Sequence, residues 1–321
     1  MPQVRNRFAG RTSKAPREVQ VTNAVHWDVA AEEFLADCKR RGHTPSTQDI
    51  YRSILLGPRT DEFLRDQRIT ALREFDANRL RRFETELQDA ELSPSTVHQY
   101  HRVLKTFLGF CVREGFDVDA RVGDVSGPRL AETEPDTYTA VEERQLIAAA
   151  RHPRDRMIVE FLLGTGLRMS ELINLDVDNV VDLGRQGAYL RVRQGKGRKD
   201  RQVHLDKDLH KQQQSYSRRH RPAGDGPLFA VTRSGGEVRR LSSEALKSML
   251  RRLGIETGIH CHAHKFRHTF ASRAIADGID PITLQRVLGH TTLQMVSRYV
   301  HYSATDLIRA WRNARAGARA V

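Results

Sequence analysis

Residues 262–303 read HAHKFRHTFASRAIADGIDPITLQRVLGHTTLQMVSRYVHYS, and this stretch decides how the rest of the chain is interpreted. His264 and Arg267 are three residues apart, so they would share one face of a helix. His290 lies 26 residues after His264, and Tyr299 lies nine residues after His290. Taken alone, a pair such as His290 and Tyr299 is more often a core histidine and a half-buried tyrosine. A functional interpretation therefore needs support from other parts of the chain.

The chain is strongly basic. Its 321 residues include 53 Lys and Arg against 40 Asp and Glu, which gives a net charge of +13 and a pI near 10.1. A net charge of this size indicates which kinds of molecule the protein binds and says little about its fold. Nucleic acid is the leading partner, because Arg and Lys neutralise its phosphates. A merely basic protein stays open on composition alone.

Several classes of protein are excluded. No run approaches about 18 consecutive apolar residues, so no membrane span is expected. The basic N-terminus lacks the apolar region of a secretory signal. Cys38, Cys111 and Cys261 are widely separated and argue against a disulfide framework. The expected location is the reducing cytoplasm, on the nucleoid if the partner is DNA.

The pattern predicts two folded domains. Residues 1–22 are basic, lack apolar periodicity and are interpreted as a flexible arm. A helical domain is expected over 23–120, a linker over 121–136, a second domain over 137–303 and a tail helix over 304–321.

Helical periodicity predicts four helices in the first domain, which start near residues 27, 44, 76 and 93. The second and fourth both begin with Pro-Ser-Thr. Such polar residues suit phosphate contact at a helix N-terminus or ordinary N-capping, and both interpretations stay open.

The second domain is predicted to be mixed and mostly α. Residues 139–180 indicate three helices, with breaks at Gly164 and Gly166. Helices are expected over most of 242–312. Alternating stretches predict two strands of a hairpin around a Gly-Lys-Gly loop: AYLRVR (188–193), QGKGRKD (194–200) and RQVHL (201–205). The predicted fold class is mainly α, with a helical first domain and a small β-sheet or hairpin in the second.

The second domain contains six candidate reactive side chains, and none of them is a carboxylate. They are Arg168, Lys196, His264, Arg267, His290 and Tyr299. Carboxylate clusters hold Mg²⁺ in most nucleases and polymerases, so this set indicates a metal-free reaction. Two arginines can bind the non-bridging oxygens of a phosphodiester and stabilise charge on its phosphorus. A tyrosine can attack the phosphorus, and a lysine or histidine can protonate the leaving 5′-oxygen.

Four motifs together resemble the tyrosine recombinases, or phage integrase family, in their order and spacing: TGLRMSEL (165–172), QGKGRKDR (194–201), HKFRHTFA (264–271) and LGHTTLQMVSRYVH (288–301). The layout resembles the Xer type over residues 23–303. The resemblance implies a core-DNA-binding domain in 23–120 and the family's catalytic fold in 137–303.

The resemblance assigns the phosphate pocket to four residues. It implies that Arg168 and Arg267 clamp the scissile phosphate and that His290 completes the pocket. Glu171, one helical turn after Arg168, would orient its neighbours without performing chemistry.

The resemblance also assigns the groups that move protons. Lys196 would be the general acid, and it is favoured over Lys199 because it lies in the Gly-Lys-Gly turn. His264 would assist proton transfer. Tyr299 would be the nucleophile, and its spacing and the following histidine favour it over Tyr302.

No metal and no cofactor are expected. His260, Cys261, His262 and His264 crowd together, but their spacing is not a finger pattern and no second ligand pair follows.

The implied activity is site-specific DNA recombination through a 3′-phosphotyrosine and a Holliday junction, without ATP. The implied partners are double-stranded DNA with paired inverted half-sites and further copies of the chain. These copies would form a dimer on each site and a tetrameric synapse, with residues 304–321 docking on a neighbour. Alternatives are a type IB topoisomerase, a telomere resolvase or a catalytically inactive DNA-binding regulator. No membrane partner is expected.

Overall fold

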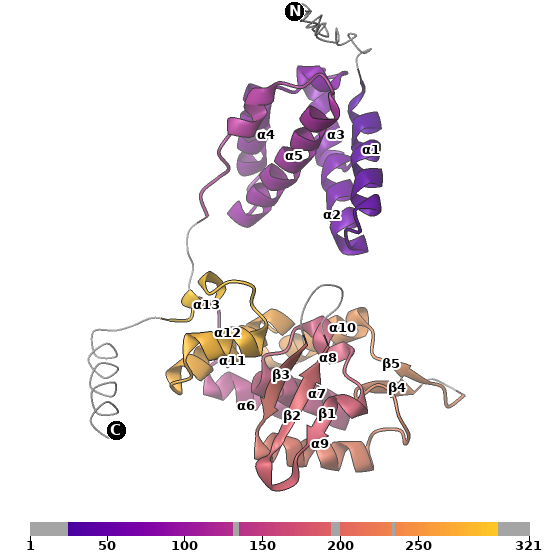
Figure 1. The fold of residues 1–321 in the computed structure, drawn as a ribbon, viewed down its shortest axis with the longest axis vertical. Helices are drawn as coiled ribbons and strands as arrows, with labels where there is room; N and C mark the ends of the chain where they lie inside the picture. The colour runs from indigo at the N-terminus through magenta and orange to yellow at the C-terminus, as the bar shows by residue number, and fades with distance from the viewer. Residues whose placement is uncertain (1–24, 131–134, 194–199, 233–234, 301–321) are drawn as a thin grey trace, which may run out of the picture. The chain divides into compact units, whose positions relative to one another are not determined.

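The computed structural model describes residues 25–130, 135–193, 200–232 and 235–300. The chain divides into two units, Met1–Glu132 and Thr133–Val321 (Figure 1). Each unit has its own hydrophobic core. No helix in the described ranges is long and apolar enough to cross a membrane. The predictions for the arm, for the Gly-Lys-Gly loop with Lys196 and Lys199, and for the tail with Tyr302 concern residues outside these ranges.

The first unit is a helical bundle: α1 (Trp27–Arg40), α2 (Pro45–Leu55), α3 (Pro58–Asp66), α4 (Ala77–Asp89) and α5 (Pro94–Glu114). Aromatic side chains fill its core, where the Trp27 ring lies 4.9 Å from Phe75 and 5.0 Å from Phe107. The Trp27 Nε1–H donates to the carbonyl of Leu55 at 2.8 Å, which ties α1 to the end of α2. The prediction of four helices was wrong by one, because α3 had not been expected.

The residues directly before the two Pro-Ser-Thr stretches are N-caps. The Thr44 and Ser93 side chains accept hydrogen bonds from the backbone N–H groups of Thr47 and Thr96, one turn into α2 and α5. The chain after α5 forms a short 3₁₀ turn, Ala120–Asp124, that buries its Val122 against the first core. The ordered start of the expected 121–136 linker therefore belongs to the first unit.

The second unit is mostly helical with small sheets, as expected. Its helices are α6 (Ala140–Ala149), α7 (Pro153–Thr165), α8 (Met169–Ile173), α9 (Lys207–Arg219), α10 (Ser243–Thr257), α11 (Ala263–Ala276), α12 (Pro281–Leu288) and α13 (Gln294–Ser297). Its strands are β1 (Val180–Asp182), β2 (Ala188–Val192), β3 (Arg201–Leu205), β4 (Ala230–Thr232) and β5 (Val238–Arg240).

The larger sheet is antiparallel in the order β1-β2-β3, and β4 pairs with β5 in a separate ribbon. The predicted hairpin is β2 and β3, with Leu190 opposite Val203. Alternate residues of both strands are buried, which is the period of two expected for a strand with one face on the core. On β3 the buried positions are Arg201, Val203 and Leu205, so a charged residue shares the inward face with two aliphatic ones.

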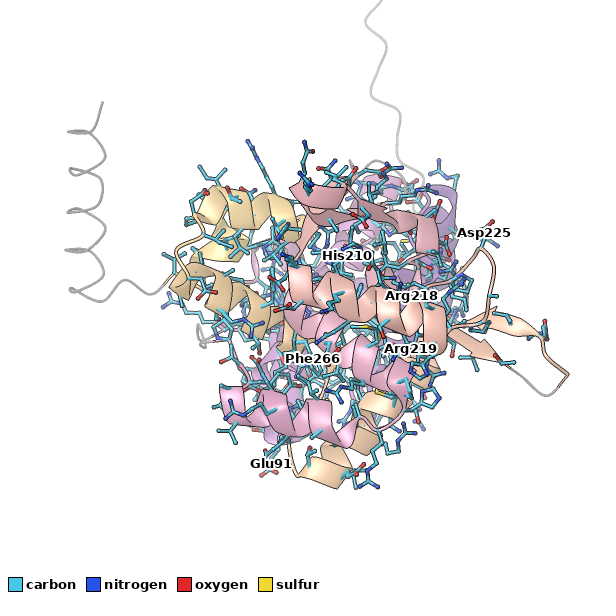
Figure 2. The ribbon with its side chains drawn as sticks, turned by 90° about the horizontal axis from the view of Figure 1, so that it is seen from below. Glu91, His210, Arg218, Arg219, Asp225 and Phe266 are labelled. Atoms are coloured by element: carbon cyan, nitrogen blue, oxygen red, sulfur yellow. The ribbon has the colours of Figure 1, made fainter. Side chains whose placement is uncertain are left out.

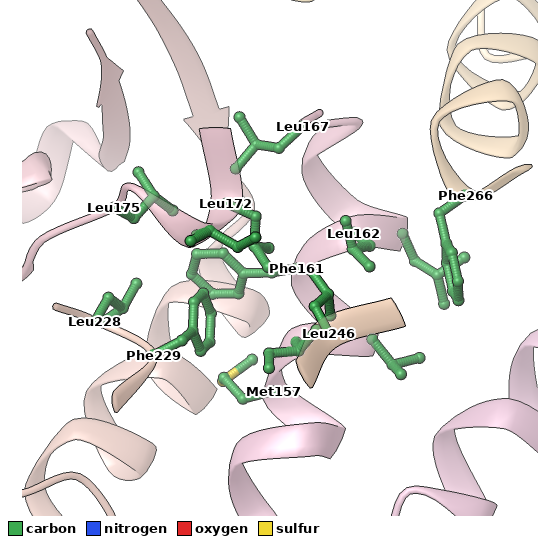
Figure 3. Packing of buried hydrophobic residues seen from close by; sticks show 14 of the residues in the cluster. Met157, Phe161, Leu162, Leu167, Leu172, Leu175, Leu228, Phe229, Leu246 and Phe266 are labelled. Atoms are coloured by element: carbon green, nitrogen blue, oxygen red, sulfur yellow. The ribbon is translucent and has the colours of Figure 1, made fainter. Parts of the chain in front are cut away.

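The core of the second unit is built around α7, which is buried along most of its length. Figure 3 shows Phe161 of α7 against Phe229, with ring centroids 5.5 Å apart in an edge-to-face arrangement. Both α9 and α11 pack on α7. The exposed basic end of α9 carries Arg218 and Arg219 into solvent (Figure 2).

Gly164 does not interrupt α7, and that prediction was wrong. The helix continues to Thr165, and a Cβ at position 164 would lie 2.6 Å from Cδ2 of Leu209 on α9. Gly164 therefore allows close helix packing. The break is at Gly166, which has a left-handed φ of +61° and ends the helix. A Cβ there would lie 2.4 Å from the Phe270 ring of α11.

We expect Gly166→Ala to destabilise the second unit more than Gly258→Ala. Both glycines have positive φ, but a Cβ at Gly258 meets no atom within 4 Å. The Gly258 change should cost about 1–2 kcal/mol for the left-handed backbone alone. The Gly166 change should add about 1–3 kcal/mol for overpacking. Thermal unfolding midpoints of the two variants measure the difference, and equal shifts would contradict it.

Candidate active site

Arg168, Arg201 and Arg267 converge on the C-terminal end of α12, although they come from three separate elements. Their guanidinium groups donate hydrogen bonds to the carbonyl oxygens of residues 287–289 at 2.6–3.2 Å. The last carbonyls of a helix lack intrahelical partners and lie at the negative end of its dipole. The arginines satisfy these carbonyls, and in return the end of α12 holds the guanidinium groups in place.

The turn after α7 places the first arginine. Gly166 reverses the chain, and Arg168 becomes the N-cap residue of α8. The backbone N–H and the Nη1 of Arg168 both donate to the Glu171 carboxylate at 2.8 Å. The carbonyl of Gly166 accepts a 2.8 Å hydrogen bond from Nη1 of Arg267. One glycine turn therefore fixes the positions of two arginines.

Glu171 joins Arg168 to Arg201. Its carboxylate accepts two further hydrogen bonds from Arg201, at 2.8 and 2.7 Å, in a bidentate pair. Burial alone would raise the pKa of Glu171, but the hydrogen bonds and charge of Arg201 and the bonds from Arg168 outweigh it and lower the pKa to about 2. Glu171 is therefore ionised at neutral pH and available only as a hydrogen-bond acceptor.

These four side chains carry a net charge of +2, because one carboxylate faces three guanidinium groups. Arg267 is only 2% exposed. Its burial, followed by the positive charge of Arg168, lowers its pKa to about 10. Buried charge of one sign is costly until a counter-charge arrives. The cluster therefore has the charge and the donors that an anion accepting forked hydrogen bonds, such as a phosphodiester, would require.

His264 and His290 lie in the field of these arginines. Burial, and then the charge of Arg267, lower the pKa of both, that of His290 to about 4. Both imidazoles are therefore neutral near pH 7. The backbone N–H of His290 donates to Gln285 at 3.0 Å just after the left-handed Gly289 cap of α12. The His290 Nδ1 is buried and meets no hydrogen-bond partner among the described residues.

Tyr299 is buried at the end of the short helix α13. Its ring packs in a small core with side chains of α11, α12 and α13, and it is 6% exposed. Burial raises the pKa of its hydroxyl, while the charges of Arg267 and Arg298 act in the opposite direction. The hydroxyl oxygen lies 2.7 Å from Nδ1 of His268, on α11.

The structure brings most of the predicted residues together. Arg168, Glu171 and Arg267 belong to one hydrogen-bonded cluster at the end of α12. His264, His290 and Tyr299 are close enough to Arg267 for its charge to shift their pKa values. The roles given to these side chains stay predictions.

Arg201 and His268 were not predicted as site residues. The alternation of RQVHL places Arg201 on the same face as Val203 and Leu205, and a charged residue on a core face signals a buried ion pair. His268 lies one helical turn after His264, so the helix spacing offered a similar signal.

Among the residues that the structure describes, one group of side chains could hold a metal ion. The ligand atoms of Asp136, His260 and His262 all lie within 4.8 Å of one another. Neither Cys261 nor His264 belongs to this group. The buried Lys265 already pairs with Asp136 at 2.9 Å, and its positive charge opposes a cation. These residues are distinct from the arginine cluster, and no step proposed below passes through them.

Comparison with known proteins identifies a family and relatives that match most of the chain. The family model described as "Phage integrase family" matches residues 137–306. Tyrosine recombinase XerA of Pyrococcus furiosus is 32% identical over 231 residues, which are 71% of this chain and 77% of that protein. Tyrosine recombinase XerD of Corynebacterium glutamicum is 33% identical over 235 residues, 70% of this chain and 75% of that protein.

Two solved structures share the fold at lower identity. The lambda integrase dimer bound to a COC′ core site has a TM-score of 0.67 at 18% identity, and the match covers 86% of this chain and 77% of that one. XerH bound to difH substrate in a pre-cleavage complex has a TM-score of 0.64 at 21% identity, covering 87% and 82%. The expected fold class is confirmed.

Proposed function

The chain belongs to the phage integrase family and is a site-specific tyrosine recombinase, and we propose that the arginine cluster at the end of α12 binds the scissile phosphate for attack by Tyr299. One observation carries this proposal. Three arginines and a single carboxylate form a cluster of net positive charge, and a tyrosine lies within the field of the most buried arginine.

In the proposed cleavage step, Arg168 and Arg267 hold the non-bridging oxygens of the phosphodiester. The Tyr299 hydroxyl gives its proton to a neutral histidine nearby, and its oxygen forms a bond to phosphorus as the bond from phosphorus to the 5′-oxygen breaks. The products are a 3′-phosphotyrosine and a free 5′-hydroxyl, which takes its proton from Lys196. A 5′-hydroxyl of the partner duplex then reverses the step. Bond energy is kept in the phosphotyrosine, so ATP is not needed.

The remaining groups support this reaction. Glu171 and Arg201 brace Arg168 through the bidentate carboxylate pair. Neutral His290 can donate a hydrogen bond to the phosphate. Its buried Nδ1 has no hydrogen-bond partner among the described residues, which supports this role. His264 assists proton transfer from the first turn of α11.

The proposed partner is double-stranded DNA with paired inverted half-sites. The net charge of +13 supports phosphate contacts along the duplex. Structural neighbours named as a dimer on a core site and as a recombinase on its substrate support binding of one copy to each half-site. Two dimers would form the tetrameric synapse and exchange strands through a Holliday junction. The protein would act on nucleoid DNA in the cytoplasm.

We expect Tyr299→Phe to bind its DNA site and to form no covalent adduct, because the change removes only the attacking oxygen. Tyr302→Phe is the matched control and should stay active. A suicide substrate, followed by denaturing electrophoresis, measures the adduct. An adduct that survives in the Tyr299→Phe protein would show that another group attacks.

Lys196→Ala should slow cleavage by roughly 10²–10⁴, which is the usual worth of one positioned acid. A substrate with sulfur in place of the bridging 5′-oxygen has a leaving group that needs no proton. This substrate should restore much of the rate for Lys196→Ala and little for Arg168→Ala, since the arginine binds phosphate. Equal rescue of both variants, or of neither, would contradict the division of roles.

The tail is proposed to dock on a neighbouring copy. Residues Leu307 and Trp311 recur at helical spacing, and one large apolar side chain contributes about 1.5–3 kcal/mol when fully buried. A chain ending at Ser303 keeps every proposed catalytic residue. It should bind one half-site normally and lose cooperative loading of the second. Gel shifts on one and two half-sites test this, and full recombination by the truncated chain would refute the docking.

A further inference from the structure

His268 is the hydrogen-bond partner that the structure gives to the proposed nucleophile. Its Nδ1 lies 2.7 Å from the Tyr299 hydroxyl, and the ring centroids are 5.6 Å apart. The hydroxyl is neutral in the resting protein, and its O–H can donate to Nδ1 when that nitrogen carries no proton. This arrangement leaves the lone pairs of the phenol oxygen free to face another atom.

We infer that His268 orients the Tyr299 hydroxyl and accepts its proton as the phenol oxygen attacks phosphorus. The inference rests on the proposed function, because it assigns the proton acceptor for the same cleavage step. A tyrosine is a weak nucleophile while it keeps its proton, and an adjacent base is the common means of activation. His268 is already within the hydrogen-bond distance that such a base requires.

The step balances in atoms and charge. The O–H bond of Tyr299 breaks and an N–H bond forms at Nδ1 of His268, while the phenol oxygen bonds to phosphorus. The bond between phosphorus and the 5′-oxygen breaks, and Lys196 protonates that oxygen. On rejoining, a 5′-hydroxyl returns its proton to Lys196 and its oxygen bonds to phosphorus. The bond between phosphorus and the phenol oxygen breaks, and the His268 imidazolium returns its proton to that oxygen.

The surroundings of His268 suit this role. The His264 ring packs edge to face against it, with centroids 4.5 Å apart, and so restricts its rotation. Burial, and then His264, Arg298, His262 and Arg267, lower the pKa of His268 to about 4. The imidazole is therefore neutral and able to accept a proton at pH 7. A phosphodiester in the arginine cluster adds negative charge nearby, which raises this pKa and strengthens the base.

The test compares the wild-type chain with His268→Asn and His268→Ala. An asparagine oxygen near the place of Nδ1 can accept the hydrogen bond but cannot take the proton. The control is His220→Asn, at the exposed end of α9. The substrate is a duplex half-site with sulfur at the bridging 5′-position, because its leaving group needs no acid. The pH profile of adduct formation then excludes the contribution of Lys196.

We expect the wild-type and control rates to fall on the acid side as His268 becomes protonated. His268→Asn should bind DNA normally, react roughly 10²–10⁴ times more slowly and lose this acid limb. His268→Ala should be at least as slow. An Asn variant with the wild-type rate would overturn the inference, and so would a slow Asn variant that keeps the acid limb. A wild-type chain that forms no adduct would instead refute the proposed function.

A second measurement does not depend on how the His268 variants fold. Nitrogen NMR of the histidine-labelled wild-type chain reports which ring nitrogen is protonated. Tyr299→Phe identifies the His268 signals, because the change removes its hydrogen bond. We expect Nδ1 to be the unprotonated nitrogen. A proton on Nδ1 in the wild-type chain would overturn the inference.

Discussion

The hydrogen bonds from three arginines to the end of α12 are the constraint on which the rest of the site depends. Arg168, Arg201 and Arg267 come from a turn, a strand and a helix, yet each donates to a carbonyl of residues 287–289. A helix terminus with unpaired carbonyls and a negative dipole can hold several cations together that would otherwise repel one another. Glu171 reduces the repulsion further by pairing with two of them.

The same contacts connect the fold to the chemistry. Gly166 ends α7, allows α11 to approach closely and offers its carbonyl to Arg267. Gly289 ends α12 and turns the chain directly into His290. The following α13 then buries Tyr299 against α11, within reach of His268. Tyr299 thus shares one small core with α11 and α12, and the arginines bind the end of the same α12, so packing sets the geometry between them.

The sequence predicted much of the site because its chemistry requires particular residue types at fixed spacings. Arg168, Arg267 and Glu171 meet as expected, and the alternation of β2 and β3 was visible in their residues. Helix α3 was missed because its nine residues, PRTDEFLRD, contain few apolar positions.

Other features depend on contacts between distant segments. Gly164 resembles a helix break in sequence, and only the approach of Leu209 from α9 shows that it serves packing. Arg201 becomes a site residue because β3 brings it to Glu171, 30 positions away in the chain. Helix spacing places His268 near His264, but its contact with Tyr299, which lies 31 positions later, is visible only in the structure. Local patterns do not contain such distances.

The most direct test of the account is the affinity of the Tyr299→Phe chain for a half-site whose scissile phosphate is replaced by an uncharged methylphosphonate. Hydrogen bonds to charged groups contribute about 1.5–3 kcal/mol, so the neutral linkage should weaken binding by about tenfold or more. The same replacement at a distant phosphate should matter less, and adding Arg168→Gln should remove most of the preference for the charged linkage. Equal affinity for the charged and neutral scissile linkages would contradict the claim that the arginine cluster binds this phosphate.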